Sequence, residues 1–125
     1  MERLLIDNVR PFDSRRGALG PASRIVIDGP RIAEVTAEPR KVDGARRIDG
    51  GGRVALPGLI DAHVHVTAYM HDLMGQALKP PSLIVAESSR ILREMLLRGF
   101  TTVRDAAGAD FGLQEAVAKG LFEGP

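Results

Sequence analysis

The sequence predicts a mixed α/β chain with an all-β part over residues 1–55 and, from residue 56, the opening of a parallel β/α array. Two observations carry this prediction. Short aliphatic runs separated by turn residues fill the first part, and they show no helical periodicity. The second part alternates strand-like and helix-like segments, an order that predicts parallel strands joined by right-handed crossovers.

In the first part, runs of aliphatic and β-branched residues predict strands over residues 3–8, 23–28 and 31–36. Asp28-Gly29-Pro30 is a compact turn between the last two runs, so we expect these to form a hairpin. The glycines at 50–52 break the chain again, and residues 53–56 resume an extended run that leads into Pro57-Gly58.

In the second part, the pattern predicts strands over residues 59–66 and 100–104 and helices over residues 82–98 and 112–120. The first helix has apolar residues at helical spacing, Ser82 as its candidate N-cap and Gly99 at its end. These are two β/α units, whereas a barrel needs eight, over roughly 250 residues. We therefore expect the natural chain to continue beyond Pro125 and to supply the other units.

Composition argues against several classes of partner. With 17 basic and 16 acidic residues, 4% aromatic residues and no Trp, the chain has neither the basic surface nor the stacking groups that nucleic-acid binding needs. No run approaches the roughly 18 consecutive apolar residues of a membrane span, and the N-terminus lacks a signal-peptide pattern. We expect a cytoplasmic protein without a membrane or nucleic-acid partner. Cysteine is absent, so any metal must be held by nitrogen and oxygen ligands.

The run of residues 59–66 carries the most informative pattern. If it is a strand, Asp61, His63 and His65 share one face, and the aliphatic residues at 60, 62, 64 and 66 share the other, which we expect to face the helix over 82–98. Residues two apart on a strand lie roughly 6.5 Å apart, and imidazoles at that spacing can converge on one metal ion. The alternative is a solvated strand face, which typically carries Thr, Lys or Glu instead.

The run GGRVALPGLIDAHVHV (residues 51–66) resembles the signature of the amidohydrolase superfamily, written roughly PGxxDxHxH, which opens a metal-bearing (β/α)8 barrel. Residues 1–55 resemble the amino-terminal half of the small β-sandwich that these enzymes build from both chain ends. The stretch ILREMLLRGFTTVRDAAGADFGLQEAVAKG (residues 91–120) resembles the branch that contains imidazolonepropionase and the prolidase-like dipeptidases. The resemblance covers the whole chain, but about the first third of a complete family member.

This resemblance implies part of a β-sandwich followed by the first two units of a (β/α)8 TIM barrel. It implies that His63 and His65 are ligands of a divalent metal, expected to be zinc, with one or two ions in the complete protein. It further implies that Asp61 holds a histidine or the nearby backbone in place. The remaining ligands and the general base are expected beyond residue 125.

The implied activity is hydrolysis of C–N bonds by metal-activated water, with a dipeptide or an N-acyl amino acid as the expected small-molecule substrate. Two alternatives stay open: a mononuclear-metal cyclic-amide hydrolase or deaminase, and a catalytically silent scaffold. Silent members usually lose a first-strand histidine, whereas this chain has both. A homo-oligomer is compatible with each alternative. These 125 residues alone are expected to be inactive and marginally stable.

Three further residues are candidates for the substrate rim. His71 follows the expected strand end by five residues, and we expect it to lie in a loop near the barrel mouth and not to bind the metal. Arg104 and Asp105 end the second strand at the same rim, where residues that contact substrate gather in barrels. For these two, an ion pair or a loop cap is an equally good interpretation.

Overall fold

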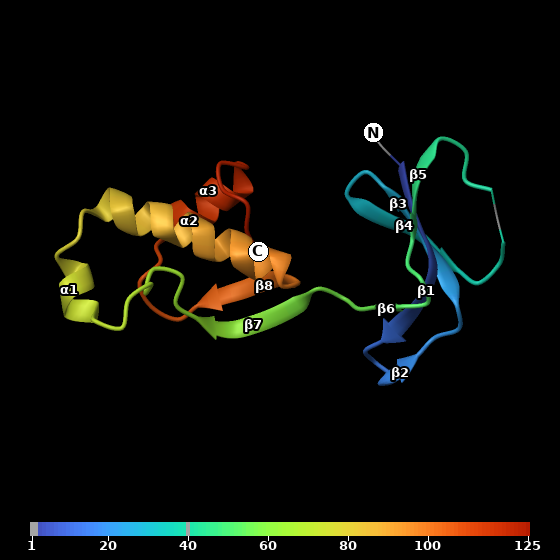
Figure 1. The fold of residues 1–125 in the computed structure, drawn as a ribbon, viewed down its shortest axis with the longest axis horizontal. Coiled ribbons are helices and arrows are strands. Elements are labelled where there is room, and N and C mark those ends of the chain that lie inside the picture. The colour runs from blue at the N-terminus through green and yellow to red at the C-terminus, as the bar shows by residue number, and fades with distance from the viewer. Residues whose placement is uncertain (1–2, 40) are drawn as a thin grey trace. The chain divides into compact units, whose positions relative to one another are not determined.

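The computed structural model describes residues 3–39 and 41–125, which fall into two compact units (Figure 1). One unit ends at Pro57 and the other spans Gly58–Pro125. This division lies two residues beyond the boundary that the sequence predicts. In the described residues, the first unit contains only strands, and the second contains every helix and a pair of parallel strands.

The first unit is a six-stranded sheet organised around one long strand, β1. Its strands are β1 (Arg3–Asp13), β2 (Ala18–Leu19), β3 (Ser23–Asp28), β4 (Arg31–Thr36), β5 (Ala45–Asp49) and β6 (Val54–Ala55). β1 pairs antiparallel with β2 and β3 and parallel with β5 and β6, at different points along its length. Leu5 and Val9 of β1 and Val26 of β3 are its buried apolar residues.

The predicted hairpin is confirmed, because β3 and β4 pair antiparallel around a turn in which Gly29 has a positive φ of 56°. The predicted first strand was too short: β1 runs to Asp13, with a register shift between Ile6 and Val9 at Asn8, whose φ is 54°. β2 and β5 were not predicted. Both have mostly exposed residues and no local apolar pattern. β2 has only two residues and pairs with the nearby end of β1, whereas β5 is defined by pairing with the distant start of β1.

In the second unit, β7 (Leu59–Val64) and β8 (Phe100–Asp105) pair in parallel, joined through α1 (Leu73–Ala77) and α2 (Pro81–Leu97), and α3 (Phe111–Ala118) follows (Figure 1). Apart from the short α1, where the sequence predicts a loop, this is the β/α order that the sequence predicts. The core consists of Val64, Val66, Leu92 and Leu113, with partly buried neighbours from both longer helices.

The longer helices lie within two residues of their predicted bounds at either end, but the predicted cap of α2 is wrong. The helix begins at Pro81 with Pro80 as its N-cap residue, not Ser82. Proline suits the first helical position because its φ is preset and it has no N–H to satisfy there. At the other end, Gly99 has the positive φ, 95°, expected of a residue that ends a helix.

The face of β7 that packs on the helices is only partly as predicted. Val64 and Val66 are buried beside Leu92 of α2, as expected, whereas Ile60 is 73% exposed and Ala62 is also exposed. The β7–β8 ladder has two register shifts, so strict alternation does not run through the strand. In addition, α2 lies against β8 and so leaves the beginning of β7 uncovered.

Within residues 3–39 and 41–125, no helix has both the length and the apolar character needed to cross a membrane.

Candidate metal centre

The two histidines of the motif lie side by side at the carboxyl end of β7. His63 is within the strand and His65 is the first residue after it. Their ring centroids are 5.2 Å apart and their planes meet at 80°. Both residues are exposed. The structure thus brings together two imidazoles. Imidazole nitrogen is a common ligand of Zn²⁺ in proteins, together with thiolate sulfur and carboxylate oxygen.

Asp61 supports the backbone of the first histidine. Its Oδ1 accepts a hydrogen bond from the backbone N–H of His63 at 3.1 Å. This contact falls in the stretch between Asp61 and Val64 where the β7–β8 register shifts. The carboxylate thus satisfies a backbone donor where the ladder is irregular, and it fixes the peptide that carries the His63 ring.

The ring of His65 is oriented by a backbone carbonyl from the other loop. Nδ1 of His65 lies 3.1 Å from the carbonyl oxygen of Ala107, in the loop after β8. Since a carbonyl can only accept, the neutral ring must carry its proton on Nδ1. Nε2 then keeps its lone pair. A histidine ligand with its second nitrogen bound in this way is the usual arrangement in metal sites.

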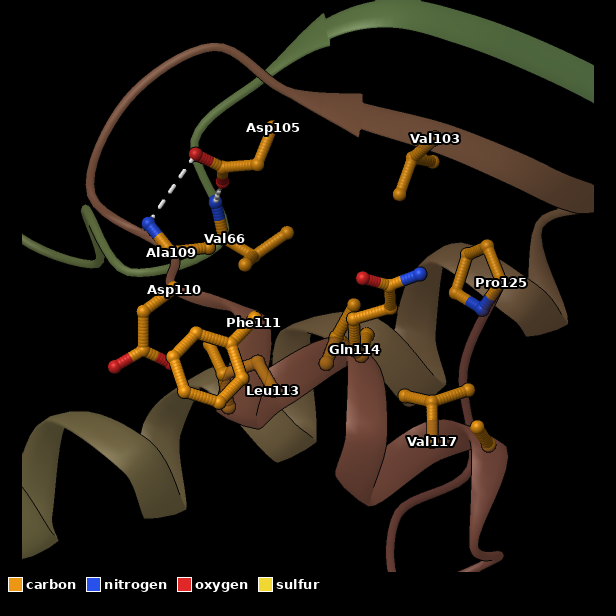
Figure 2. A pocket seen from close by; sticks show the side chains of 12 residues that line it. Val66, Val103, Asp105, Ala109, Asp110, Phe111, Leu113, Gln114, Val117 and Pro125 are labelled. Carbon is orange, nitrogen blue, oxygen red and sulfur yellow. Dashed lines mark hydrogen bonds between the residues drawn. The ribbon is translucent and has the colours of Figure 1, made fainter.

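Asp105 connects the ends of the two strands (Figure 2). Its Oδ2 accepts a hydrogen bond from the backbone N–H of Val66 at 2.7 Å. Its Oδ1 accepts from the backbone N–H groups of Ala107 at 3.0 Å and Ala109 at 3.3 Å. This carboxylate therefore serves as a loop cap, one of the two uses that the sequence left open for it.

The loop after β8 packs closely on the segment after β7. The backbone N–H of Ala106 donates to the carbonyl of Val64 at 2.9 Å. Gly108 has a φ of 106°, and a Cβ atom placed on it would lie 2.3 Å from Oγ1 of Thr67. Only glycine fits this approach without displacing the threonine.

The other two candidate residues do not extend the histidine pair. His71 is exposed in the bend before α1, and Arg104 is exposed next to Asp105. Across the part of the chain that the structure describes, no three or more His, Cys, Asp or Glu residues form a group that could hold a metal ion. The histidine pair alone therefore falls short of the about three protein ligands that a catalytic metal needs.

Two residues near the histidines were missed by sequence reasoning. Ala107 acts through its carbonyl, and no side-chain pattern signals that. Gln76 of α1 is buried. Its Oε1 accepts hydrogen bonds from the backbone N–H groups of Tyr69 at 3.0 Å and Met70 at 3.2 Å. Its Nε2 donates to the carbonyl of Thr67 at 2.7 Å. It holds the loop that follows His65. No sequence pattern around a single glutamine in a helix predicts that role.

A cavity of about 570 Å³ lies between β8 and α3 (Figure 2). Val66, Val103, Leu113 and Val117 line it, with Asp105 at its edge, and neither histidine does. Its lining includes the core residues Val66, Leu92 and Leu113, and we assign it no part in the metal centre.

Comparison with known proteins decides the family. The sequence profile of the amidohydrolase family matches residues 54–125, the stretch that contains both histidines and Asp61. The chain belongs to the amidohydrolase family. The resemblance identified from the residue 51–66 motif is thereby confirmed.

Curated relatives of this amidohydrolase include two adenine deaminases. The enzyme of Edwardsiella ictaluri (strain 93-146) is 35% identical over 111 residues, which are 85% of this chain and 19% of that protein. The enzyme of Gluconobacter oxydans (strain 621H) is 48% identical over 63 residues, which are 50% of this chain and 10% of that protein.

Solved structures include a prolidase complexed with N-methylphosphonate-L-proline, with a TM-score of 0.90 and 44% identity over 98% of this chain and 30% of that one. Another, described as an amidohydrolase, has a TM-score of 0.90 and 41% identity with the same coverage. The structure thus matches the beginning of the amidohydrolase fold. The chain spans less than a third of each of these relatives.

Proposed function

We propose that the complete protein hydrolyses C–N bonds with a divalent metal, and that His63 and His65 are two of the metal ligands. The observation that carries the proposal is the pair of imidazoles 5.2 Å apart at the carboxyl end of β7, with the Nδ1 of His65 bonded to a carbonyl and its Nε2 left as a donor. The family match over the same residues supports it.

The donor set suits zinc, in one or two ions. Imidazole nitrogen is a common zinc ligand, and the chain has no cysteine that would select a thiolate site. When a divalent ion is bound, the chemistry it supplies is polarisation of the scissile carbonyl and acidification of water near neutral pH. The missing ligands and the base that transfers the proton are assigned to the later part of the protein, since the relatives extend far beyond this chain.

Within this chain, each residue of the centre has a separate task in the proposed mechanism. His63 and His65 hold the ion, and Asp61 fixes the peptide of His63 through the 3.1 Å bond to its N–H. Arg104, exposed near the end of β8, and His71, exposed in the bend before α1, are assigned to the substrate rim. The reaction then needs a substrate carbonyl or C–N carbon placed within reach of the ion.

The first substrate class that we propose is a dipeptide with a carboxyl-terminal proline or a related N-acyl amino acid. Support comes from the 44% identity to a prolidase over 98% of this chain, a longer match than those to the adenine deaminases. The second candidate is a purine with an exocyclic amine, because the adenine deaminases are 35% to 48% identical over shorter segments. A catalytically silent scaffold is disfavoured by the retention of both histidines.

We also propose that β7 and β8 are the first two strands of a (β/α)8 barrel and that the sheet of β1–β6 is one part of a composite β-sandwich. The exposed apolar residues Leu59 and Ile60 of β7, 44% and 73% exposed, support this arrangement because neighbouring strands and helices of a barrel would cover them. A cytoplasmic location remains a prediction from the sequence.

The test is an activity assay on the complete protein. The metal is removed with a chelator and replaced with Zn²⁺, and three substrates are compared: an Xaa-Pro dipeptide, an N-acyl proline and adenine. We expect hydrolysis of the proline compounds that disappears on metal removal and returns on reconstitution. Turnover of adenine alone would establish the second candidate. A metal-loaded protein inactive on all three would contradict both.

A further inference from the structure

We propose that Asp105 is a positioning residue for His65: it holds the loop after β8 so that the Ala107 carbonyl accepts the Nδ1–H of the His65 ring. The ring is then fixed in the tautomer that leaves Nε2 as a metal donor. The consequence for metal binding rests on the proposed function, whereas the consequence for the ring tautomer does not.

Both carboxylate oxygens of Asp105 accept hydrogen bonds from backbone N–H groups. Oδ2 faces the N–H of Val66, and Oδ1 faces those of Ala107 and Ala109. Figure 2 shows two of these contacts, those with the backbone N–H groups of Val66 and Ala109. Such an arrangement fixes two loops against each other and does not present a free oxygen to a substrate or an ion.

Two of the three contacts of Asp105, those with Val66 and Ala107, lie next to His65. Val66 directly follows His65 in the chain, so the 2.7 Å bond to its N–H fixes the peptide that leaves the histidine. Ala107 gives its N–H to Asp105 and its carbonyl to the His65 ring, at 3.0 Å and 3.1 Å. One carboxylate therefore positions both the backbone beside the histidine and the acceptor of its ring.

The Asp105→Asn variant keeps the shape of the side chain but replaces one acceptor oxygen with a donor group. Asparagine has one acceptor oxygen and one NH₂ group. Since N–H groups face both oxygens of Asp105, the NH₂ of Asp105→Asn would face a backbone donor on one side. One set of contacts must then be lost. If the NH₂ faces Ala107 and Ala109, the Ala107 carbonyl is free to move away from the ring; if it faces Val66, the peptide that follows His65 loses its partner. Partners that orient metal-bound histidines typically account for 10–100-fold in metal affinity.

A matched control is available in the same loop. Asp110 caps α3 by accepting a hydrogen bond from the backbone N–H of Gly112 at 2.9 Å, and no contact links it to His65. Asp110→Asn makes the same chemical change five positions further along. It reports the effect of weakening a backbone cap without disturbing the His65 partner.

The experiment uses the complete protein, with two readouts for wild type, Asp105→Asn and Asp110→Asn. The first is the Kd for Zn²⁺, measured by competition with a chromogenic chelator. The second is the tautomer of His65 in the metal-free protein, measured by ¹⁵N NMR with histidine-selective labelling above pH 8 and assigned with His65→Gln. The signals of His63 in the same spectra are an internal control.

The proposal predicts an Nδ1-protonated His65 in wild type and in Asp110→Asn. In Asp105→Asn it predicts a mixture of tautomers, an unchanged His63 and a Kd for Zn²⁺ raised 10–100-fold. Equal Kd values and unchanged His65 signals in a folded Asp105→Asn would overturn it. So would an Nε2-protonated His65 in wild type, a result that needs no variant and applies even if Asp105→Asn does not fold. If wild type binds no Zn²⁺, the proposed function fails, while the tautomer comparison still decides the role of Asp105.

Discussion

The carboxylate of Asp105 accepts a hydrogen bond from the backbone N–H of Val66 at 2.7 Å, across 39 positions of the sequence. Asp105 is the last residue of β8, and Val66 lies just beyond the end of β7. This bond joins the carboxyl ends of the two strands, the edge at which parallel barrels place their chemistry. The rigidity of this edge leads to the first prediction.

Gly108 should be intolerant of any side chain. Gly108→Ala forces a non-glycine residue to a φ of 106° and places its Cβ 2.3 Å from Thr67 Oγ1, so we expect a loss of about 1–3 kcal/mol in the free energy of unfolding. Gly120→Ala is the control, because its φ is 68° and a Cβ there meets nothing within 4 Å; about 1 kcal/mol is expected. Urea unfolding followed by circular dichroism at 222 nm measures both. Equal losses would argue against the close approach of Thr67.

Leu92 should be the residue of α2 that contributes most to the core. It is 5% exposed and packs with Val64, Val66 and Leu113, so Leu92→Ala is expected to cost about 2–5 kcal/mol of unfolding free energy. Leu97→Ala, in the same helix but 69% exposed, is expected to change it by less than about 0.5 kcal/mol. The same unfolding measurement on the complete protein compares them. A larger effect at Leu97 would mean that the helix packs through its other face.

In the first unit, Asp7 should be far more sensitive to substitution than other aspartates. Its side chain is 12% exposed and pairs with Arg24 at 3.3 Å and Arg47 at 2.5 Å. Asp7→Asn removes the charge of a largely buried carboxylate that both arginines contact, at a cost of roughly 3 kcal/mol. Hydrogen exchange of the β1 amides, which reports on this unit alone, measures the change.

The control for Asp7 is Asp28→Asn. Asp28 also pairs with an arginine, Arg3, at 3.1 Å, but its side chain is 48% exposed. Exposed pairs contribute about 0–1 kcal/mol, so a small effect is expected. If both variants reduce protection equally, burial of the Asp7 pair does not control the stability of the sheet.

The elements that could be predicted from the sequence are those with a complete local pattern. The β3–β4 hairpin has two aliphatic runs around Asp28-Gly29-Pro30, and α2 has a clear apolar period. β5 could not be predicted, because its residues ARRID are strand-forming only through their pairing with β1, some forty positions away.

In the candidate site, too, the residues with a local pattern could be predicted and those defined by distant contacts could not. His63 and His65 could be found from spacing, because a strand places residues two apart close together. The partner of His65 could not, since Ala107 lies 42 positions away and contributes only a carbonyl. The place of Asp105 at a strand end could be predicted, but not the three backbone donors that determine its role.

The central claim is that His63 and His65 bind the metal, and the metal content of purified variants of the complete protein tests it most directly. Plasma emission spectroscopy on wild type, His63→Ala, His65→Ala and His71→Ala gives bound zinc per protein. We predict a large loss of zinc in the first two variants, because each removes one of few donors. His71→Ala, in the exposed bend outside the pair, should keep the wild-type content. Full zinc content in His63→Ala and His65→Ala would contradict the account.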